Sequence, residues 1–357
     1  MQPRELVVGT RPSPLALWQA RWVMAQLEAA ADRHGLPLRF VLREIRTEGD
    51  LDRQTPLARF GQRGIFVRAV EQALRRGEVD VAVHSLKDLP GQQPPDLVLA
   101  AYPVRDDPRD AAVVADARGA SNGPLAFLPR GARVGTGSPR RIAHLRHWRP
   151  DLTFVPIRGN VDTRLGKLQG GQLDAVVLAA AGLRRLGLWD PRAHALEPHL
   201  CLPAPGQGAL AVQVRADDPV ARQAVELIDD LEVRLAVIAE RELLARLGGG
   251  CHVPIGALAQ WHGEAGQRHL RLQASVADPD GARLLTAAAA RALAALLPGG
   301  PASGTGGPSL PADPGTRREA VAAAEAQARS LAHETAEALL AQGAARLLDE
   351  AAGDSGA

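Results

Sequence analysis

The chain has 357 residues, of which 46% are hydrophobic and only 3% aromatic, and its formal net charge is +2 at neutral pH. This length exceeds one ordinary hydrophobic core, so we expect two or three domains whose cores consist of Leu, Val, Ile and Ala. The nearly balanced charge argues against a general nucleic-acid-binding protein, which would carry a basic excess over a whole domain.

Strands and helices alternate along the first hundred or so residues. Ser13 is expected to cap the first helix and Pro14 to open it. The alternation predicts a parallel, doubly wound α/β sheet. Apolar runs predict strands at residues 6–8, 38–45 and 79–83, and helical periodicity predicts helices at 15–30 and 65–76.

The same pattern then recurs. Residues 9–14 and 135–139 contain similar strand-to-helix turns, each with Gly-Thr before Ser-Pro. Asn160 is expected to cap the helix that starts at Val161. We therefore expect two similar α/β domains with a cleft between them. The predicted strands of the second domain are residues 133–135, 152–157 and 173–178, and its first helix runs to about Trp148.

The C-terminal part is expected to be a third, smaller α+β domain. Residues 209–214 predict a strand that returns to the first domain, and a helical tract follows from 219 to 247. A Gly/Pro/Ser-rich segment at 297–314 predicts a flexible insertion. Thr316 is expected to open the last helix, which runs to about Glu350, through a capping box. The predicted domains are 1–104 with 206–228, 105–205, and 229–357.

Two cysteines, Cys201 and Cys251, cannot build a disulfide framework and suit a reducing compartment. Cys201 lies between Leu200 and Leu202, which predicts a core position. No apolar run is long enough for a signal peptide or for the roughly 20 residues of a membrane span. We expect a cytoplasmic protein that does not enter a membrane.

Arginines are dense between residues 130 and 164, where Asp151 and Asp162 are the acidic residues. Arg140 and Arg141 fall in the first turn of a predicted helix, where cations oppose the helix dipole. A polyanion site would show this arrangement, and a solvated basic face is the alternative. Arg59 and Arg63 lie in a glycine-flanked segment, residues 57–64, that is either a mobile flap or an ordinary surface loop.

Asp88 follows a buried strand, at the end where open α/β sheets bind ligands. It could stabilise a cation or move protons, or it could simply cap its own turn. Cys251 follows three glycines, which favours an accessible sulfur over a buried one. It could serve as a nucleophile or as an attachment point.

Taken together, several motifs in one order resemble the porphobilinogen deaminase family. No single one of them would be specific. They are residues 10–19, 64–67, 82–90, 105–111, 138–141, 158–165, 178–187, 203–209, 240–241 and 249–256.

The resemblance implies a three-domain fold whose first two domains are similar to periplasmic binding proteins, with the active cleft between them. It implies a dipyrromethane cofactor joined by a thioether to Cys251. It also implies a transferase of tetrapyrrole (heme) biosynthesis, which joins four porphobilinogen molecules into hydroxymethylbilane with release of ammonia. We expect a monomer that acts on a small-molecule substrate and has no metal, nucleic-acid or membrane partner.

The resemblance also assigns roles to residues. Asp88 matches the catalytic carboxylate, and our hypothesis is that it stabilises a positively charged pyrrole nitrogen and relays protons. Because each porphobilinogen carries an acetate and a propionate, arginines are expected to bind these groups. The matching arginines are Arg11, Arg140, Arg141, Arg158, Arg164 and Arg185; residues expected near cofactor or substrate are Ser13, Gln19, Lys87, Ser138 and Gln207; and the expected flap residues are Arg59, Arg63 and Phe66.

Two other functions stay open at this point. A non-catalytic anion-binding module would share the two-domain cleft but would carry no covalent group. A cysteine hydrolase using Cys251 and His252 would form an acyl intermediate, although adjacent loop residues rarely make a well-oriented nucleophile–base pair.

Overall fold

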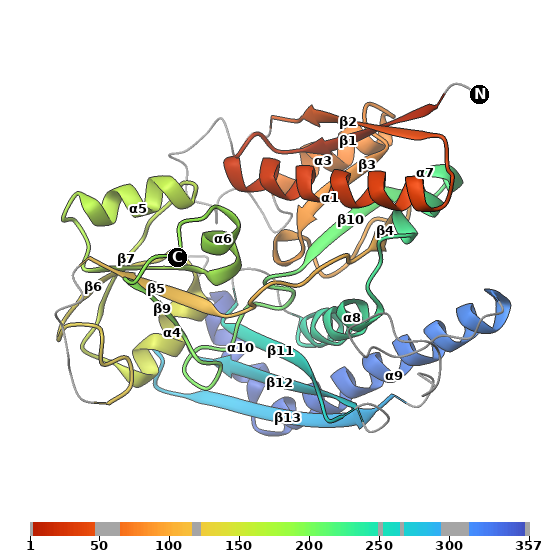
Figure 1. The fold of residues 1–357 in the computed structure, drawn as a ribbon. Coiled ribbons are helices and arrows are strands. Elements are labelled where there is room, and N and C mark those ends of the chain that lie inside the picture. The colour runs from red at the N-terminus through yellow and green to blue at the C-terminus, as the bar shows by residue number, and fades with distance from the viewer. Residues whose placement is uncertain are drawn as a thin grey trace.

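Three β-sheets organise the part of the chain that the structure describes (Figure 1). The structure is a computed structural model, and it describes residues 3–46, 65–115, 123–248, 253–264, 268–293 and 314–353. Two of the sheets have five strands each, and the third has three.

The first sheet has the strand order β2-β1-β3-β10-β4. Strand β1 runs parallel to β2 and β3, whereas β10 runs antiparallel to both β3 and β4. The strands are β1 (Arg4–Thr10), β2 (Leu38–Glu44), β3 (Val81–Ser85), β4 (Leu97–Ala101) and β10 (Leu210–Arg215).

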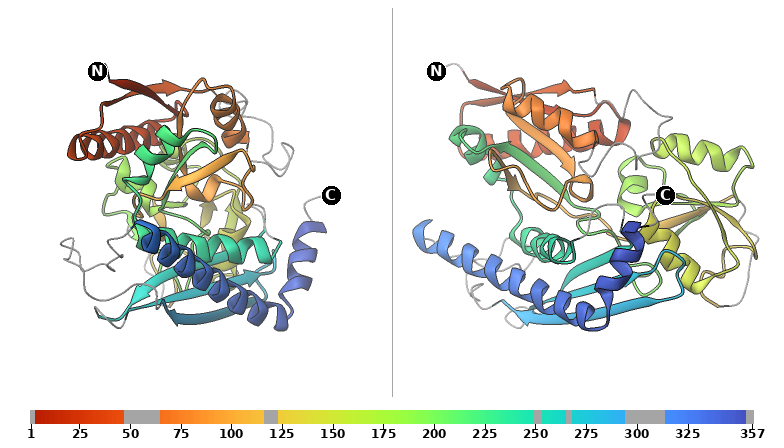
Figure 2. Two further views of the ribbon diagram at one scale, coloured as in Figure 1. Left: turned by 90° about the vertical axis from the view of Figure 1, so that its right-hand side faces the viewer. Right: turned by 180° about the vertical axis from the view of Figure 1, so that it is seen from behind.

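Helices cover both faces of this sheet. Helices α1 (Pro14–Arg33) and α7 (Pro219–Glu226) pack against Leu6 and Val8 on one face. Helix α3 (Ile65–Arg75) packs near Val7 on the other face, as the view from behind shows (Figure 2). Successive residues of β1 thus point to opposite sides and are apolar on both, which is typical of a doubly wound sheet.

The second sheet repeats this topology with the order β7-β6-β8-β5-β9. Its parallel strands are β6, β7 and β8, and β5 runs antiparallel to β8 and β9. The strands are β5 (Asp110–Val114), β6 (Arg133–Gly135), β7 (Thr153–Val155), β8 (Ala175–Ala179) and β9 (Ala193–Ala195); the helices are α4 (Pro139–Trp148), α5 (Val161–Gln169) and α6 (Ala180–Arg185).

The chain passes from the first sheet to the second between β4 and β5, and it returns between β9 and β10. An isolated bridge between Arg105 and Ala209 joins these two passes. The return confirms that the strand predicted at 209–214 belongs to the first sheet. We call residues 104–109 and 203–209 the crossover.

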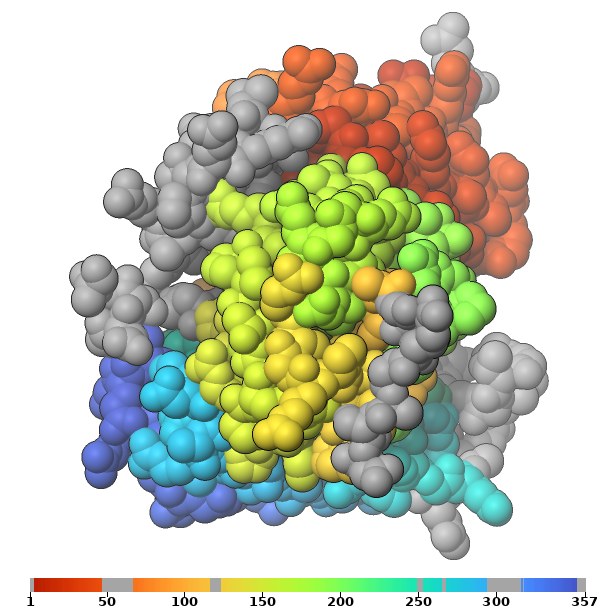
Figure 3. All heavy atoms as spheres, turned by 90° about the vertical axis from the view of Figure 1, so that its left-hand side faces the viewer, coloured from red at the N-terminus to blue at the C-terminus, as the bar shows by residue number. Residues whose placement is uncertain are grey.

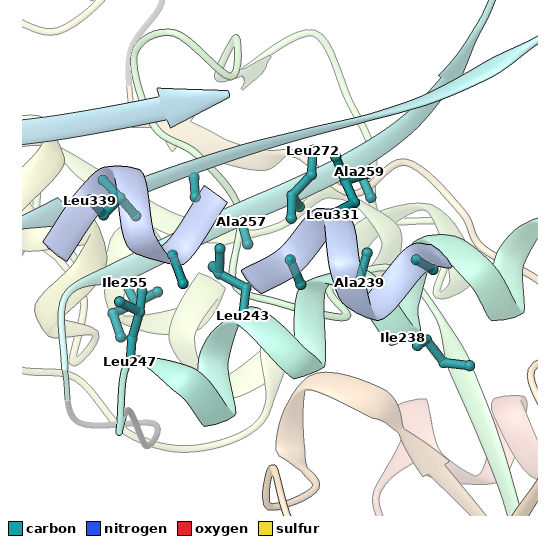
Figure 4. Close-up of a cluster of buried hydrophobic side chains, with 14 of the residues drawn as sticks. Ile238, Ala239, Leu243, Leu247, Ile255, Ala257, Ala259, Leu272, Leu331 and Leu339 are labelled. Carbon is teal, nitrogen blue, oxygen red and sulfur yellow. The ribbon is translucent and has the colours of Figure 1, made fainter. Parts of the chain in front are cut away.

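The third sheet is an antiparallel β11-β12-β13 meander. Leucines and alanines of its strands pack against the helices α8, α9 and α10, and Figure 4 shows Leu243, Ala257, Leu272 and Leu331 in this core. The elements are α8 (Leu231–Arg246), β11 (Ile255–His262), β12 (His269–Ala277), β13 (Leu284–Ala292), α9 (Pro314–Ala341) and α10 (Ala344–Gly353). Seen from the side of the second sheet, residues of this second unit face the viewer, with the first unit above them and the C-terminal part below (Figure 3).

The fold class predicted from the sequence, two doubly wound α/β units and a smaller α+β unit, is confirmed. The expectation of purely parallel sheets is wrong, because β5 and β10 run antiparallel to their neighbours. The predicted domain boundaries stay a prediction, although each sheet falls within one of the predicted ranges.

Three helix predictions need correction. The tract from 219 to 247 is two helices, because the Asp230 side chain accepts from the Val233 amide and caps a new start. The capping box at Thr316 is wrong, since α9 begins at Pro314, and Gly343, with φ of +95°, separates α9 from α10. Asn160 occupies the cap position of α5, but its side chain makes no capping hydrogen bond.

Gly208 offers a test of the crossover. Its φ is +86°, and an added Cβ would lie 2.4 Å from the carbonyl oxygen of Asp106. We expect Gly208→Ala to lower the free energy of unfolding by at least about 3 kcal/mol, because backbone strain and a backbone clash add together. Gly187→Ala is the matched control, with φ of +66° and no atom within 4 Å of the added Cβ. Its cost should be about 1 kcal/mol. Urea unfolding measures both, and equal losses would contradict this account of the crossover.

Candidate active site

A pocket opens at the carboxyl ends of β1 and β3, with a cavity volume of about 70 Å³. It brings together four residues predicted from the sequence, Arg11, Ser13, Gln19 and Asp88. Parallel strands that end side by side form such a site naturally, because the following loops diverge. The remaining lining residues are Leu15, Ala16, Val67, Val83, His84 and Ser85.

The start of α1 forms one wall of the pocket. Ser13 is the predicted N-cap, and its hydroxyl accepts a hydrogen bond from the Ala16 amide at 3.4 Å. Gln19 is buried, and its amide nitrogen donates to the Ser85 hydroxyl at 2.9 Å. The helix is thereby fixed to the end of β3, and Arg11 and Asp88 line the same pocket.

Asp88 ends a short 3₁₀ turn, Leu86–Asp88, that follows β3 directly. The turn is anchored by Leu86 and Leu89, which are buried, whereas Asp88 itself is exposed. This alternation points the carboxylate into the pocket while its neighbours hold the backbone. Asp88 is therefore placed to meet a ligand.

Several cations surround Asp88. The pKa of Lys87 falls to about 8, chiefly because the ammonium is buried and then because the Arg141 guanidinium is near, while Asp88 and Asp110 oppose the shift. The pKa of Arg164 falls to about 10, again chiefly through burial, with Arg141 and Arg158 contributing and Asp88 opposing. The mutual repulsion of cations crowded in this way falls when an anion binds.

Arg140 and Arg141 lie in the first turn of α4 and are both buried, so a solvated basic face is wrong for this pair. Their common partner is Asp110, the first residue of β5. Arg140 Nη1 donates to Oδ2 of Asp110 at 2.7 Å, and Arg141 Nε donates to Oδ1 at 2.9 Å. Burial would raise the pKa of Asp110, but the two guanidiniums outweigh it and hold that pKa well below its usual range.

Gln207 connects this cluster to the first unit. Its amide nitrogen donates to Asp110 at 2.9 Å, and its amide oxygen accepts from Lys87 Nζ at 3.2 Å. Ser138 caps α4 and accepts from the Arg141 amide. The sequence-predicted residues Lys87, Gln207 and Arg141 thus meet around one buried carboxylate.

The other predicted arginines have partners of their own. Arg185 Nε donates to Asp106 at 2.6 Å and Nη2 to the carbonyl of Gly208, so it braces the crossover. Arg164 Nε donates to the carbonyl of Gly159 at 2.8 Å. The substrate roles assigned to these residues and to Arg158 stay predictions.

Some predicted residues lie outside the part of the chain that the structure describes. They are Arg59, Arg63, Cys251 and His252, together with the side chain of Phe66 and residues 297–313 of the predicted insertion. Cys201, in contrast, is fully buried as predicted, and burial raises the pKa of its thiol to about 12.

His144 holds α4 against the C-terminal sheet. Its Nδ1 donates to the carbonyl of Arg140 at 2.8 Å, so its Nε2 accepts from the Ser275 hydroxyl at 2.8 Å. Burial, and secondarily Arg140, lowers the pKa of His144 to about 4. The histidine is therefore neutral at neutral pH and links the arginine helix to β12.

No group of three His, Cys, Asp or Glu side chains able to hold a metal ion occurs within the described ranges. Among the helices described, none has both the length and the apolar composition needed to cross a bilayer.

Comparison with known proteins identifies relatives over most of the chain. The family model described as "Porphobilinogen deaminase, dipyromethane cofactor binding domain" matches residues 6–223, and the "Porphobilinogen deaminase, C-terminal domain" model matches 234–296. A porphobilinogen deaminase of Roseiflexus sp. (strain RS-1) is 50% identical over 72% of this chain and 82% of its own length. That of Syntrophotalea carbinolica is 41% identical over 98% of this chain and 96% of its own length.

Among solved structures, a periplasmic binding protein of Salmonella typhimurium with high arginine specificity has a TM-score of 0.35 and 14% identity. The match covers 63% of this chain and 91% of that one. A likeness this weak supports no inference about ligands.

The low pKa of His144 generates a stability prediction. Its folded pKa of about 4 lies below the unfolded value of 6.5, so its stabilisation is complete above pH 6.5 and is lost as the pH falls towards 4. When the pH is lowered from 7 to 4.5, the free energy of unfolding of the unmodified chain should fall. In His144→Gln, we expect this fall to be smaller by about 2 kcal/mol.

Urea unfolding at the two pH values measures this difference. His262→Gln, at an exposed histidine on β11, is the control and should follow the unmodified chain. An unchanged pH dependence in His144→Gln would show that His144 is not the buried neutral group described.

Proposed function

This chain belongs to the porphobilinogen deaminase family, and we propose that it joins four porphobilinogen molecules head to tail into linear hydroxymethylbilane, releasing ammonia at each addition. The observation that carries the proposal is the pocket that Asp88 and Arg11 both line. A carboxylate suits a cationic pyrrole, and guanidiniums suit the acetate and propionate of each ring.

The residues present fit the dipyrromethane cofactor of the family. Its rings are flat and apolar, and they carry N–H donors and acidic side chains. The pocket offers Leu15, Val67 and Val83 for ring faces, Arg11 and Ser13 for acidic groups, and Asp88 for a pyrrole N–H. When bound, the cofactor supplies a two-ring primer, and Cys251 is the attachment point we propose.

Asp88 is the catalytic residue in this proposal. Its carboxylate accepts a hydrogen bond from a pyrrole N–H and stabilises positive charge on that nitrogen when ammonia leaves. It can then take up and pass on the proton lost when a new bond between rings is completed. Its exposure in the pocket leaves the carboxylate accessible to a ligand.

The cations around Asp88 bind and orient the substrate. Each porphobilinogen brings about two negative charges, and Arg11, Arg158, Arg164 and Lys87 are the groups we assign to them. Lys87, with a pKa of about 8, carries its charge at neutral pH and loses it in mildly alkaline solution. Substrate affinity should therefore weaken as the pH rises through 8.

We further infer a transferase that acts as a monomer in the cytoplasm, with the domains 1–104 plus 206–228, 105–205 and 229–357. Cytoplasmic location is supported by Cys201, a reduced and buried thiol. The two alternatives from the sequence, an anion-binding module and a cysteine hydrolase, lose support because a deaminase from Syntrophotalea carbinolica matches 98% of the chain.

Replacing Asp88 tests its assigned role. We expect Asp88→Asn to lower kcat for porphobilinogen at least about 100-fold with little change in KM, because the amide cannot stabilise the cation or accept the proton. Ammonia release and tetrapyrrole formation give the rates, and intact mass confirms equal cofactor loading. Asp96→Asn is the control, since Asp96 pairs with Arg75 in an exposed ion pair. Near-normal turnover by Asp88→Asn would refute the role.

A further inference from the structure

Asp110 is a charged residue of this site that sequence analysis did not single out. It opens β5 and is fully buried. Besides Arg140 Nη1, its carboxylate accepts from Arg141 Nη2 at 2.7 Å, from Gln207 Nε2 at 2.9 Å and from the Cys201 thiol at 3.5 Å. A buried carboxylate with this many donors is held in one orientation, and it holds its donors equally firmly.

The charged and amide partners of Asp110 come from two separate segments. Arg140 and Arg141 lie on α4 of the second unit, and Gln207 lies on the crossover. Through the Gln207 amide, the network continues to Lys87 in the first unit, next to Asp88. Asp110 therefore joins ligand-binding groups of both units, although it does not line the pocket itself.

The negative charge of Asp110 helps to keep Lys87 protonated. The groups that act on Lys87 are Arg141 and Arg140, which disfavour its charge, and Asp88 and Asp110, which favour it. Of the two carboxylates, Asp88 is exposed and lines the pocket, whereas Asp110 is buried among the cations. Removing the Asp110 charge leaves the guanidiniums uncompensated and makes the ammonium of Lys87 easier to neutralise.

We propose that Asp110 is a positioning residue: it orients Arg140 and Arg141 and, through Gln207, keeps Lys87 charged and directed at the substrate's carboxylates. This inference rests on the proposed function. In this proposal Asp110 does not contact the substrate. It affects the reaction by orienting the side chains to which it is hydrogen-bonded.

The test measures KM and kcat for porphobilinogen from pH 6 to pH 9 in the cofactor-loaded enzyme, with loading checked by intact mass. In Asp110→Asn, KM should rise about tenfold at neutral pH, the cost of one lost charge-assisted network. The alkaline rise in KM should also begin at lower pH than in the unmodified enzyme, because Lys87 loses its charge sooner. Asp110→Glu, which keeps the charge, should restore the position of this rise in part.

Asp218→Asn is the matched control. Asp218 is also a buried carboxylate, 7% exposed, and it pairs with Arg215 at 2.9 Å away from the pocket. Its loss should lower thermal stability and leave the pH profile of KM unchanged. A purely structural role for Asp110 would give this same result, so the two variants separate positioning from stability.

Gln207→Leu keeps the proposal testable if Asp110→Asn does not fold. It cuts the link between Asp110 and Lys87 without leaving a charge uncompensated, and the alkaline rise in KM should again move to lower pH. A loaded Asp110→Asn or Gln207→Leu enzyme with the unmodified pH profile would overturn the proposal. Failure of the unmodified enzyme to consume porphobilinogen would instead overturn the proposed function.

Discussion

Buried carboxylate–arginine pairing at the crossover is the interaction on which the arrangement of the three sheets depends. Asp110 and Glu240 are both fully buried, and each has arginine as its charged partner. Glu240, on α8, accepts from Arg105 at 2.7 Å and from the amides of Gly206 and Ala259 at 2.6 and 2.7 Å. It thereby joins both passes of the crossover to the C-terminal sheet. Loss of one partner would leave a buried charge uncompensated, which costs about 3–5 kcal/mol.

This rigid crossover explains the electrostatics of the pocket. The pocket belongs to the end of the first sheet, yet Arg141 of α4 shifts the pKa of Lys87, and Asp88 acts on Arg164 of α5. Cations from both units therefore contribute to the electrostatic potential of one pocket. Their mutual repulsion costs free energy when no anion is bound, and a substrate rich in carboxylates reduces it. The same pairing that fixes the fold thus prepares a site for a growing acidic chain.

Much of this could be predicted from the sequence, and the rest could not for physical reasons. Local sequence patterns gave correct predictions: Ser13 caps α1, and the repeated strand-to-helix turns indicate two similar units. Strand direction is not encoded in an apolar run, so the antiparallel direction of β5 and β10 was not predicted. The box-like pattern at Thr316 occurs inside a helix as readily as at its start. Asp110 is distant in sequence from Arg140, and only the fold brings them together, although a carboxylate before a fully apolar strand was a usable signal of a buried charge.

The most direct test of the account is the intact mass of the purified protein before and after incubation with porphobilinogen, with the modification mapped by peptide digestion. We predict an increment of two pyrrole rings on Cys251 at rest and further one-ring increments after substrate is added. A protein whose Cys251 stays unmodified under both conditions would contradict a primer bound beside the arginines and Asp88.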